Sequence, residues 1–373
     1  MHNRKAIVIG AGIVGLAAAR ALAIQGFKVD VFEKSGKAVG ASIRNFGMVW
    51  PISQPLGNLY DRAIKSRDIW MEICNEANIW YSARGSIHLA YQQDEMDIIE
   101  EFVDLNCDSR KVRLLNNSSA LSMSQAINPS GLMGGFYSGD EVIVNAREAI
   151  HSIPDFFTEK YGITFHFNSP VTEVYYPRIK SDSNYFYADV IYVCSGSDFE
   201  YLFPEYYSNS GLNKCKLQML KTVAQGNDYT MGPALCGGLT LLQYSAFKSC
   251  SSISQLLERT IKEQSEYLEN GIHVMACQNN LTEVIIGDSH EYGLTPDPFN
   301  RDKINRLIIA YLKKFLLLPD WKIEETWNGY YAKMAMATEL VLYPQQGVTI
   351  VNGLGGAGMT LSFGLLEELV NRI

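Results

Sequence analysis

The N-terminal segment of the chain alternates short apolar runs with glycine and polar residues. Residues 6–9 are apolar throughout, as expected for a strand that is buried on both faces of a parallel sheet. The alanine-rich residues 16–24 predict a helix, which ends at Gly26. Residues 29–32 predict a second strand, which Glu33 closes. This order of strand, glycine-rich turn, helix and strand indicates a βαβ unit.

The rest of the chain carries similar but less regular patterns. Helices are predicted at residues 61–77, 95–105, 145–161, 253–268, 300–315 and 360–370. Strands are predicted at residues 85–91, 163–167, 171–175, 188–193 and 348–351, and residues 216–290 are strand-rich around the helix at 253–268. A second glycine-rich turn, residues 353–358, joins the last strand to the last helix. Because such units stand at both ends of the chain, we expect the two ends to meet in one domain.

Composition narrows the range of partners. The chain has 373 residues, which is more than the roughly 250–300 that one hydrophobic core usually serves, so two domains are expected. A net charge of −8 argues against a nucleic-acid binder. The seven cysteines include no C-x-x-C pair, so we expect no metal site and the reduced thiols of a cytoplasmic protein. No apolar run approaches the ~20 residues of a membrane span.

The first glycine-rich turn has the spacing of a dinucleotide site. Gly10, Gly12 and Gly15 follow the first strand, and Glu33 ends the next one. Such glycines permit a tight turn, close approach of a pyrophosphate and packing of the helix on the sheet, while the acidic residue accepts hydrogen bonds from ribose hydroxyls. The alternative is a structural turn with a surface glutamate, which the complete βαβ context disfavours. An acidic residue here also disfavours the 2′-phosphate of NADP.

The second glycine-rich turn favours FAD over NAD. A second helix N-terminus directed at the same crevice suits a longer cofactor with a flavin at its far end. A flexible C-terminal linker is the alternative reading of these glycines. The apolar strand and helix on either side of them disfavour it.

The sequence resembles the D-amino-acid-oxidase family of FAD enzymes, which includes glycine oxidase and monomeric sarcosine oxidase. The resemblance is dense in residues 6–33, 40–51, 189–196 and 352–368. Within the family, A-S-I-R-N-F-G-M-V-W-P (residues 41–51) and N-G-L-G-G-A-G-M-T-L-S-F-G-L (residues 352–365) resemble the branch associated with phosphonate breakdown. Members of that branch are thought to oxidise an amine like aminoethylphosphonate.

The resemblance implies an α/β fold, with a glutathione-reductase-like FAD-binding Rossmann domain and a second, sheet-rich α+β domain for the substrate. The FAD domain is expected to be discontinuous, from residues 1–80, 140–215 and 325–373. The substrate domain is expected from residues 81–139 and 216–324.

The family's cofactor roles are carried over to matching positions. Phosphate, ribose, adenine and flavin contacts are expected from Gly10, Gly12, Gly15, Glu33, Ala41, Ser42, Arg44, Asn45, Gly47, Met48, Val171, Ser195, Gly196, Gly355, Gly356, Gly358, Met359 and Thr360. Relatives that link flavin covalently use Cys or His. Residues 40–51 and 330–344 contain neither, so we expect FAD to be bound non-covalently.

Substrate contacts follow from the same resemblance. Some relatives bind a substrate carboxylate with an arginine where this chain has Tyr330, Tyr331 and Lys333, which questions an ordinary α-amino acid. Arg44 and Lys333 are the cationic candidates for a phosphonate or carboxylate, although Arg44 also suits the cofactor phosphates and Lys333 a solvated surface. The other candidate pocket residues, for which ordinary packing is the alternative, are Trp50, Gln54, His88, Trp327 and Tyr330.

The expected reaction is oxidation of a small primary or secondary amine by hydride transfer to flavin N5, with oxygen or another electron acceptor as the second substrate. An FAD-dependent monooxygenase is one alternative, and it usually carries a later G-D phosphate motif; we assign no such phosphate motif in this chain. A NAD-dependent dehydrogenase would not need the second glycine-rich turn. A non-catalytic FAD-binding protein is the remaining alternative. The catalytic side chains, the substrate and the oligomeric state stay open.

Overall fold

A computed structural model describes residues 4–372, and it contains the predicted N-terminal βαβ unit. The unit consists of β1 (Lys5–Ile9), α1 (Ile13–Ile24) and β2 (Lys28–Phe32). β1 and β2 pair in parallel, with Ile7 opposite Asp30. β1 is buried from Ala6 to Ile9, in agreement with its apolar sequence.

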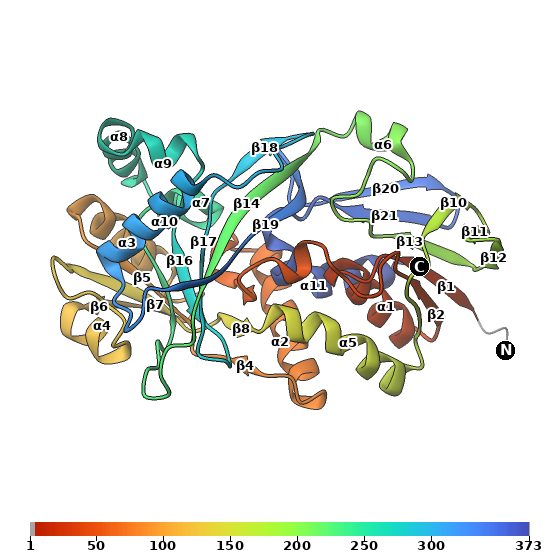
Figure 1. The fold of residues 1–373 in the computed structure, drawn as a ribbon, viewed down its shortest axis with the longest axis horizontal. Helices are drawn as coiled ribbons and strands as arrows, with labels where there is room; N and C mark the ends of the chain where they lie inside the picture. Colours follow the sequence, from red (N-terminus) through yellow and green to blue (C-terminus); the bar gives the residue numbers. More distant parts are fainter. Residues whose placement is uncertain (1–3, 373) are drawn as a thin grey trace.

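This unit lies inside a sheet that, within residues 4–372, has six strands. Their order is β20–β21–β13–β1–β2–β9. The strands added here are β9 (Thr164–His166), β13 (Val190–Val193), β20 (Leu340–Gln345) and β21 (Val348–Asn352). All neighbours are parallel except β20 and β21. Both ends of the chain therefore contribute to one sheet (Figure 1), and the α/β fold class is confirmed.

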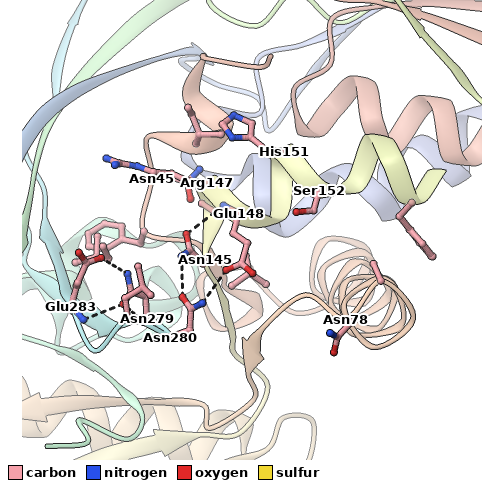
Figure 2. Close-up of a pocket in the computed structure, with 18 of the residues that line it drawn as sticks. Asn45, Asn78, Asn145, Arg147, Glu148, His151, Ser152, Asn279, Asn280 and Glu283 are labelled. Carbon is pink, nitrogen blue, oxygen red and sulfur yellow. Dashed lines mark hydrogen bonds between the residues drawn. The ribbon is translucent and has the colours of Figure 1, made fainter. Parts of the chain in front are cut away.

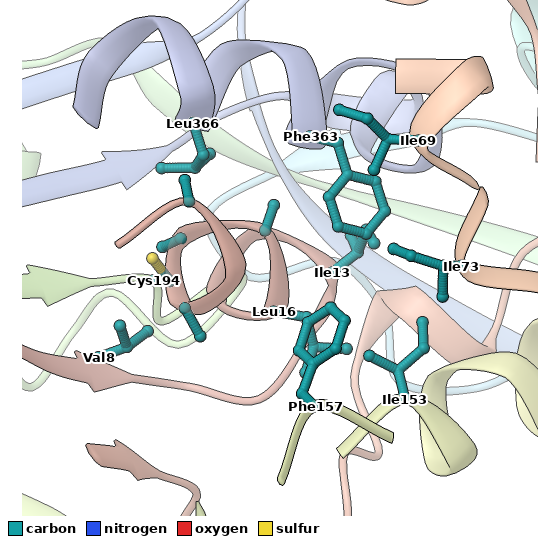
Figure 3. Close-up of a cluster of buried hydrophobic side chains, with 14 of the residues drawn as sticks. Val8, Ile13, Leu16, Ile69, Ile73, Ile153, Phe157, Cys194, Phe363 and Leu366 are labelled. Carbon is teal, nitrogen blue, oxygen red and sulfur yellow. The ribbon is translucent and has the colours of Figure 1, made fainter. Parts of the chain in front are cut away.

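Helices from distant parts of the sequence share a core with this sheet. They are α1, α2 (Asn58–Glu76), α5 (Ala146–Tyr161) and α11 (Gly358–Val370). Phe363 of α11 meets Trp70 of α2 edge to face, with ring centroids 5.3 Å apart. Figure 3 shows Phe363 beside Ile69, with Leu16 and Phe157 in the same cluster. This packing fixes the N-termini of α1 and α11 relative to the strand ends.

The second large sheet is mainly antiparallel and, within residues 4–372, has nine strands. Its path is β18–β14–β17–β16–β15–β5–β7–β6, and β19 pairs with the other edge of β14. The strands are β5 (Ser86–Ala90), β6 (Val112–Asn116), β7 (Gly134–Ser138), β14 (Leu212–Thr222), β15 (Ala234–Cys236), β16 (Met275–Gln278), β17 (Val284–Gly287), β18 (Glu291–Gly293) and β19 (Ile323–Met334). The two sheets lie towards opposite ends of the long axis in Figure 1.

Further helices accompany the second sheet. They are α3 (Gln93–Asn106), α4 (Asn117–Met123), α8 (Ile253–Glu263), α9 (Ser265–Glu269) and α10 (Asp302–Phe315). The single helix expected at residues 253–268 is wrong, because the chain leaves helical geometry at Gln264, with φ −141° and ψ 32°. The break places Tyr267 against Tyr311, with ring centroids 5.4 Å apart. Tertiary packing thus overrides a helix-compatible pattern.

Smaller elements complete the fold. Two three-stranded sheets contain β3 (Met48–Val49), β8 (Val142–Val144) and β4 (Tyr81–Ser82), and β10 (Val171–Tyr175), β11 (Arg178–Ser181) and β12 (Asn184–Tyr187). Short helical turns are α6 (Pro204–Ser208), α7 (Thr240–Gln243), η1 (Ala41–Ile43), η2 (Pro51–Ser53), η3 (Ser245–Ser249) and η4 (Gly355–Ala357). β14 crosses the expected domain boundary at 215/216, and β19 crosses the expected boundary at 324/325. The domain limits themselves stay a prediction. Within residues 4–372, no helix combines the length and the apolar character needed to cross a membrane.

Candidate functional site

Two adjoining cavities run from the first sheet towards the second. The sheet-edge cavity, of about 750 Å³, lies at the carboxyl ends of β1, β2, β13 and β21. The inner cavity, of about 780 Å³, reaches the second sheet. Both are lined by Ile13, Ala41, Ser42, Arg44, Tyr331, Gly353, Leu354, Gly355 and Gly358. These shared walls make one elongated crevice, and the carboxyl edge of a parallel sheet is where α/β proteins usually bind ligands.

The turn between β1 and α1 depends on glycine. Gly10 has a φ of +103°, and a Cβ there would lie 2.4 Å from the carbonyl oxygen of Cys194. A Cβ on Gly15 would lie 1.8 Å from the carbonyl oxygen of Gly10. Gly15 therefore lets α1 pack against the turn and lies outside the lining of both cavities, whereas Gly10 and Gly12 line the sheet-edge cavity.

Two helix N-termini face the crevice. α1 begins after Gly12 and α11 after Ala357, and neither of these two residues caps its helix with a side chain. The amide of Ile13 donates to Ser42 Oγ at 2.9 Å, which holds η1 against the start of α1. Gly358, the first residue of α11, lines both cavities. Uncapped amide groups and the positive helix ends favour anionic ligand groups at both places.

Glu33 ends β2 and faces the sheet-edge cavity. Its carboxylate accepts hydrogen bonds from the backbone amides of Ala11 and Ser35, each at 3.0 Å. These bonds hold the side chain in place and leave further lone pairs free on both oxygens. Ser195 lines the same cavity and has a buried Oγ without a hydrogen-bond partner among residues 4–372.

The inner cavity has a cationic lining. Arg44, Lys248 and Lys333 line it, and among the described residues Asp288 is its one acidic side chain. Within residues 4–372, none of the three cations has a carboxylate within 4.0 Å. Because the whole chain carries a net charge of −8, this local excess of positive charge is a specific feature of the cavity.

Asp288 lies between two histidines in the wall of the inner cavity. His273 Nε2 is 3.2 Å from Asp288 Oδ1, and His290 Nε2 is 3.8 Å from Oδ2. His290 Nδ1 is bonded to the carbonyl of Gly271 at 2.9 Å, and the two imidazoles stack with centroids 5.2 Å apart. Burial raises the pKa of Asp288 to about 6 and lowers that of His273 well below its usual value.

Residues 5–372 match the DAO family, described as FAD dependent oxidoreductase. The chain belongs to this family. Membership confirms FAD as the cofactor and an oxidoreductase as the class of enzyme. The crevice agrees with this assignment. It contains the N-termini of α1 and α11, the Glu33 carboxylate, and glycines at the β1–α1 turn that let a ligand come close to the backbone.

The chain is similar to several known proteins. It is 22% identical over 276 residues to the bifunctional tRNA 5-methylaminomethyl-2-thiouridine biosynthesis protein MnmC of Saccharophagus degradans, and the match covers 70% of this chain but 38% of that protein. Glycine oxidase from Geobacillus kaustophilus superposes with a TM-score of 0.76 at 18% identity, covering 100% of this chain and 95% of the other. L-proline dehydrogenase from P. horikoshii gives 0.78 at 18%, covering 99% and 94%. These likenesses show the fold.

Most residues expected from the family lie around the crevice. The lining of the two cavities includes Gly10, Gly12, Glu33, Ala41, Ser42, Arg44, Asn45, Met48, Trp50, Gln54, Val171, Ser195, Gly196, Tyr330, Lys333, Gly355, Gly356, Gly358, Met359 and Thr360. Met48 lies in β3 and Trp50 directly before η2, and the amide of Trp50 donates to Thr360 Oγ1 at 2.9 Å. This bond joins the segment after η1 to the start of α11.

Four expected residues lie outside this lining, namely Gly15, Gly47, His88 and Trp327. Gly47 packs against β8, where a Cβ would lie 1.9 Å from the carbonyl oxygen of Val144. His88 is 1% exposed and stacks on Phe136 with centroids 4.6 Å apart, and burial lowers its pKa to about 3. Both histidine nitrogens face apolar core instead of the cavity.

Trp327 lies at a third cavity of about 990 Å³, which shares Asn45 and Phe46 with the inner cavity. Its Nε1 donates to the carbonyl of Arg44 at 3.1 Å. Figure 2 shows that several polar side chains of this cavity bond to one another; Asn280 bonds to Asn145 at 2.9 Å and to Glu148 at 3.0 Å. Through its hydrogen bond, Trp327 holds the backbone of Arg44 from the side of the third cavity.

His273, Asp288 and His290 were not among the site residues predicted from the sequence. His273 lies just before β16, Asp288 directly after β17 and His290 directly before β18. β17 pairs with both β16 and β14, and β14 also pairs with β18, so the fold brings the three residues together although their spacing in the chain has no simple period. One signal was present, since the polar run G-D-S-H directly follows the apolar residues 284–286. Polar residues at a strand end are a recurring position for functional side chains.

Proposed function

We propose that the protein oxidises a small primary or secondary amine that carries a phosphonate or carboxylate group. The observation that carries this proposal is the cationic lining of the inner cavity, which is continuous with the glycine-lined sheet-edge cavity. The names of structural neighbours support the amine class, since they include glycine oxidase and iminodiacetate oxidase from Chelativorans sp. BNC1. The phosphonate choice rests on the resemblance of residues 41–51 and 352–365 to the phosphonate-associated branch.

FAD would lie along both cavities. Gly10 and Gly12 would allow its pyrophosphate to approach the amides at the start of α1, and Glu33 would accept hydrogen bonds from the adenosine ribose. Ser195 lines the same cavity, and its unpartnered Oγ would bond the cofactor there. The flavin end would reach the start of α11, whose positive helix end favours negative charge on the ring.

The chemistry supplied by bound FAD is acceptance of a hydride from the α-carbon of the amine. The chain's own residues bind and orient the substrate for that step. Lys333 extends from β19 into the inner cavity, and Arg44 approaches it from the segment after η1. A phosphonate or carboxylate held by these cations would fix one end of the substrate and leave its amine end inside the cavity.

The test is anaerobic reduction of the FAD-loaded protein by an amine, which is measured as the loss of the visible flavin absorbance. The amines are glycine, sarcosine, D-alanine, aminoethylphosphonate and N-methyl-aminoethylphosphonate. We expect bleaching by one or both phosphonates at the lowest concentrations. A yellow protein that no amine bleaches would contradict the proposal.

Charge removal at Lys333 tests how the anion is recognised. Lys333→Met keeps the aliphatic stem and removes the charge, so the substrate Kd from the reduction rates should rise roughly 10- to 150-fold, the value of one charged hydrogen bond. Lys322→Met, at an exposed position outside both cavities, is the matched control and should leave Kd unchanged. Unchanged affinity in both Lys333→Met and Arg44→Met would contradict this account of anion binding.

A further inference from the structure

Asp288 is a buried carboxylate in a cavity that otherwise presents cations. It is 5% exposed and directly follows β17, whose backbone pairs with β14 and β16. The titratable groups around it come from all the elements packed against it, and they are Cys215, Tyr244, His273, His290, Tyr292, Tyr331 and Lys333. Two of them, His290 and Lys333, partly offset the effect of burial on its pKa.

Some polar atoms of this cluster have no hydrogen-bond partner within residues 4–372. Among residues 4–372, Asp288 Oδ1 and His273 Nδ1 are buried and have no hydrogen-bond partner. His273 Nε2 is 3.2 Å from Oδ1 but is not aligned for a hydrogen bond, and His290 Nε2 is 3.8 Å from the other oxygen. A buried carboxylate oxygen without a donor is costly. A ligand that brings a donor into the cavity would relieve this cost.

We propose that Asp288 binds the ammonium group of the substrate and accepts its proton before the amine is oxidised. The inference rests on the proposed amine oxidation and deepens it. One N–H bond of the ammonium breaks, an O–H bond forms on Asp288, and the electron pair stays on nitrogen. The neutral amine that results can release a hydride from its α-carbon, whereas the ammonium cannot.

Burial makes this transfer feasible. A free alkylammonium has a pKa near ~10, far above that of a solvated carboxyl. Burial of an ammonium lowers its pKa, to about 5–6 in documented cases. Burial has the opposite effect on a carboxyl and raises the pKa of Asp288 to about 6. The two values therefore converge inside the cavity, and the pair can exchange a proton at little cost.

The test compares wild type, Asp288→Asn and Asp288→Glu in the FAD-loaded protein with aminoethylphosphonate. The quantity measured is the second-order rate constant of anaerobic flavin reduction between pH 6 and 10. Wild type uses the abundant ammonium form, so its rate constant should be nearly level above pH 7. Asp288→Asn must capture the free neutral amine, which is about 0.1% of the total at pH 7 for a pKa near ~10. We expect a loss of up to about 1000-fold at pH 7, a rise of tenfold per pH unit, and recovery by pH 10.

Two variants serve as controls for this interpretation. Asp288→Glu keeps a carboxylate and should keep the level pH profile even if its rate falls. Asp228→Asn removes an exposed carboxylate and should match wild type at every pH. Two results would overturn the inference: an Asp288→Asn rate within about threefold of wild type at pH 7, or an equal loss at all pH values.

The failure of the proposed function is distinguishable from failure of this inference. If no amine reduces the wild-type flavin, amine oxidation is wrong. Asp288 is then tested by binding alone, from the change in flavin absorbance on adding aminoethylphosphonate. Binding to Asp288→Asn should be at least tenfold weaker at pH 7 and approach wild type at pH 10, and equal binding at pH 7 would refute the role of Asp288.

Discussion

Replacing Gly10 with alanine perturbs the turn on which the cofactor crevice is built. The residue has a φ of +103°, and an added Cβ would lie 2.4 Å from the carbonyl oxygen of Cys194. A side chain in such a sparsely populated conformation costs about 1–3 kcal/mol. Forcing an atom into occupied space costs about 1–3 kcal/mol more. We therefore expect Gly10→Ala to lower the free energy of unfolding by about 2–6 kcal/mol.

Thermal unfolding followed by circular dichroism measures this loss. For 373 residues, an unfolding entropy of about 2.1 cal/mol/K per residue gives roughly 0.8 kcal/mol/K, so the expected fall in Tm is about 3–8 °C. The same displacement moves Cys194 and the start of α1, which line the sheet-edge cavity. The Kd for FAD, measured by fluorescence titration of the apoprotein, should therefore rise at least about tenfold.

Gly226→Ala is the matched control for this prediction. A Cβ at Gly226 meets nothing within 4 Å, and its backbone is outside the left-handed region. Its Tm should be unchanged or slightly higher, because alanine restricts the unfolded chain. If Gly10→Ala had the Tm and the FAD affinity of wild type, the steric argument for this turn would be refuted.

Two further predictions concern pH and cofactor attachment. Burial, helped by the nearby charge of Asp140, raises the pKa of Glu141 from an ordinary 4.5 to about 7. The stability that this group contributes is present below pH ~4.5 and is lost as the pH rises to 7, so the Tm of wild type should fall relative to that of Glu141→Gln between pH 5 and 8. A difference in Tm that does not vary with pH would contradict this assignment. For the cofactor, acid precipitation should leave all the flavin in the supernatant, whereas flavin retained on the polypeptide would disprove non-covalent binding.

The cofactor half of the site could be predicted because its signals are local. The spacing of Gly10, Gly12 and Gly15 lies within one turn, and the adjacent apolar runs became β1 and β2 almost at the expected residues. Phosphate recognition by backbone amides at a helix start needs little more than this short segment. The position of α11 beside α1 followed from the same kind of signal at the other end of the chain.

The inner cavity could not be predicted in this way. Its wall is made by side chains on an antiparallel sheet, and the sequence does not encode which residues of distant strands stand opposite each other. His88 illustrates the error, since its strand β5 was expected correctly but the side chain turns into the core. Asp288 illustrates the omission, because only the pairing of β17 with β14 and β16 brings it to the cavity.

The charges of the inner cavity also link the two proposals. Lys333 lowers the pKa of Asp288 and so opposes the effect of burial. An anionic substrate group bound at Lys333 would neutralise that cation and let the pKa of Asp288 rise. Proton capture by Asp288 would then be favoured once the anionic end is bound, which is when the amine end is held in the cavity. An amine that lacks the anionic group would lose both its anchor and this increase in basicity. The cavity would in this way select zwitterionic amines through one electrostatic coupling.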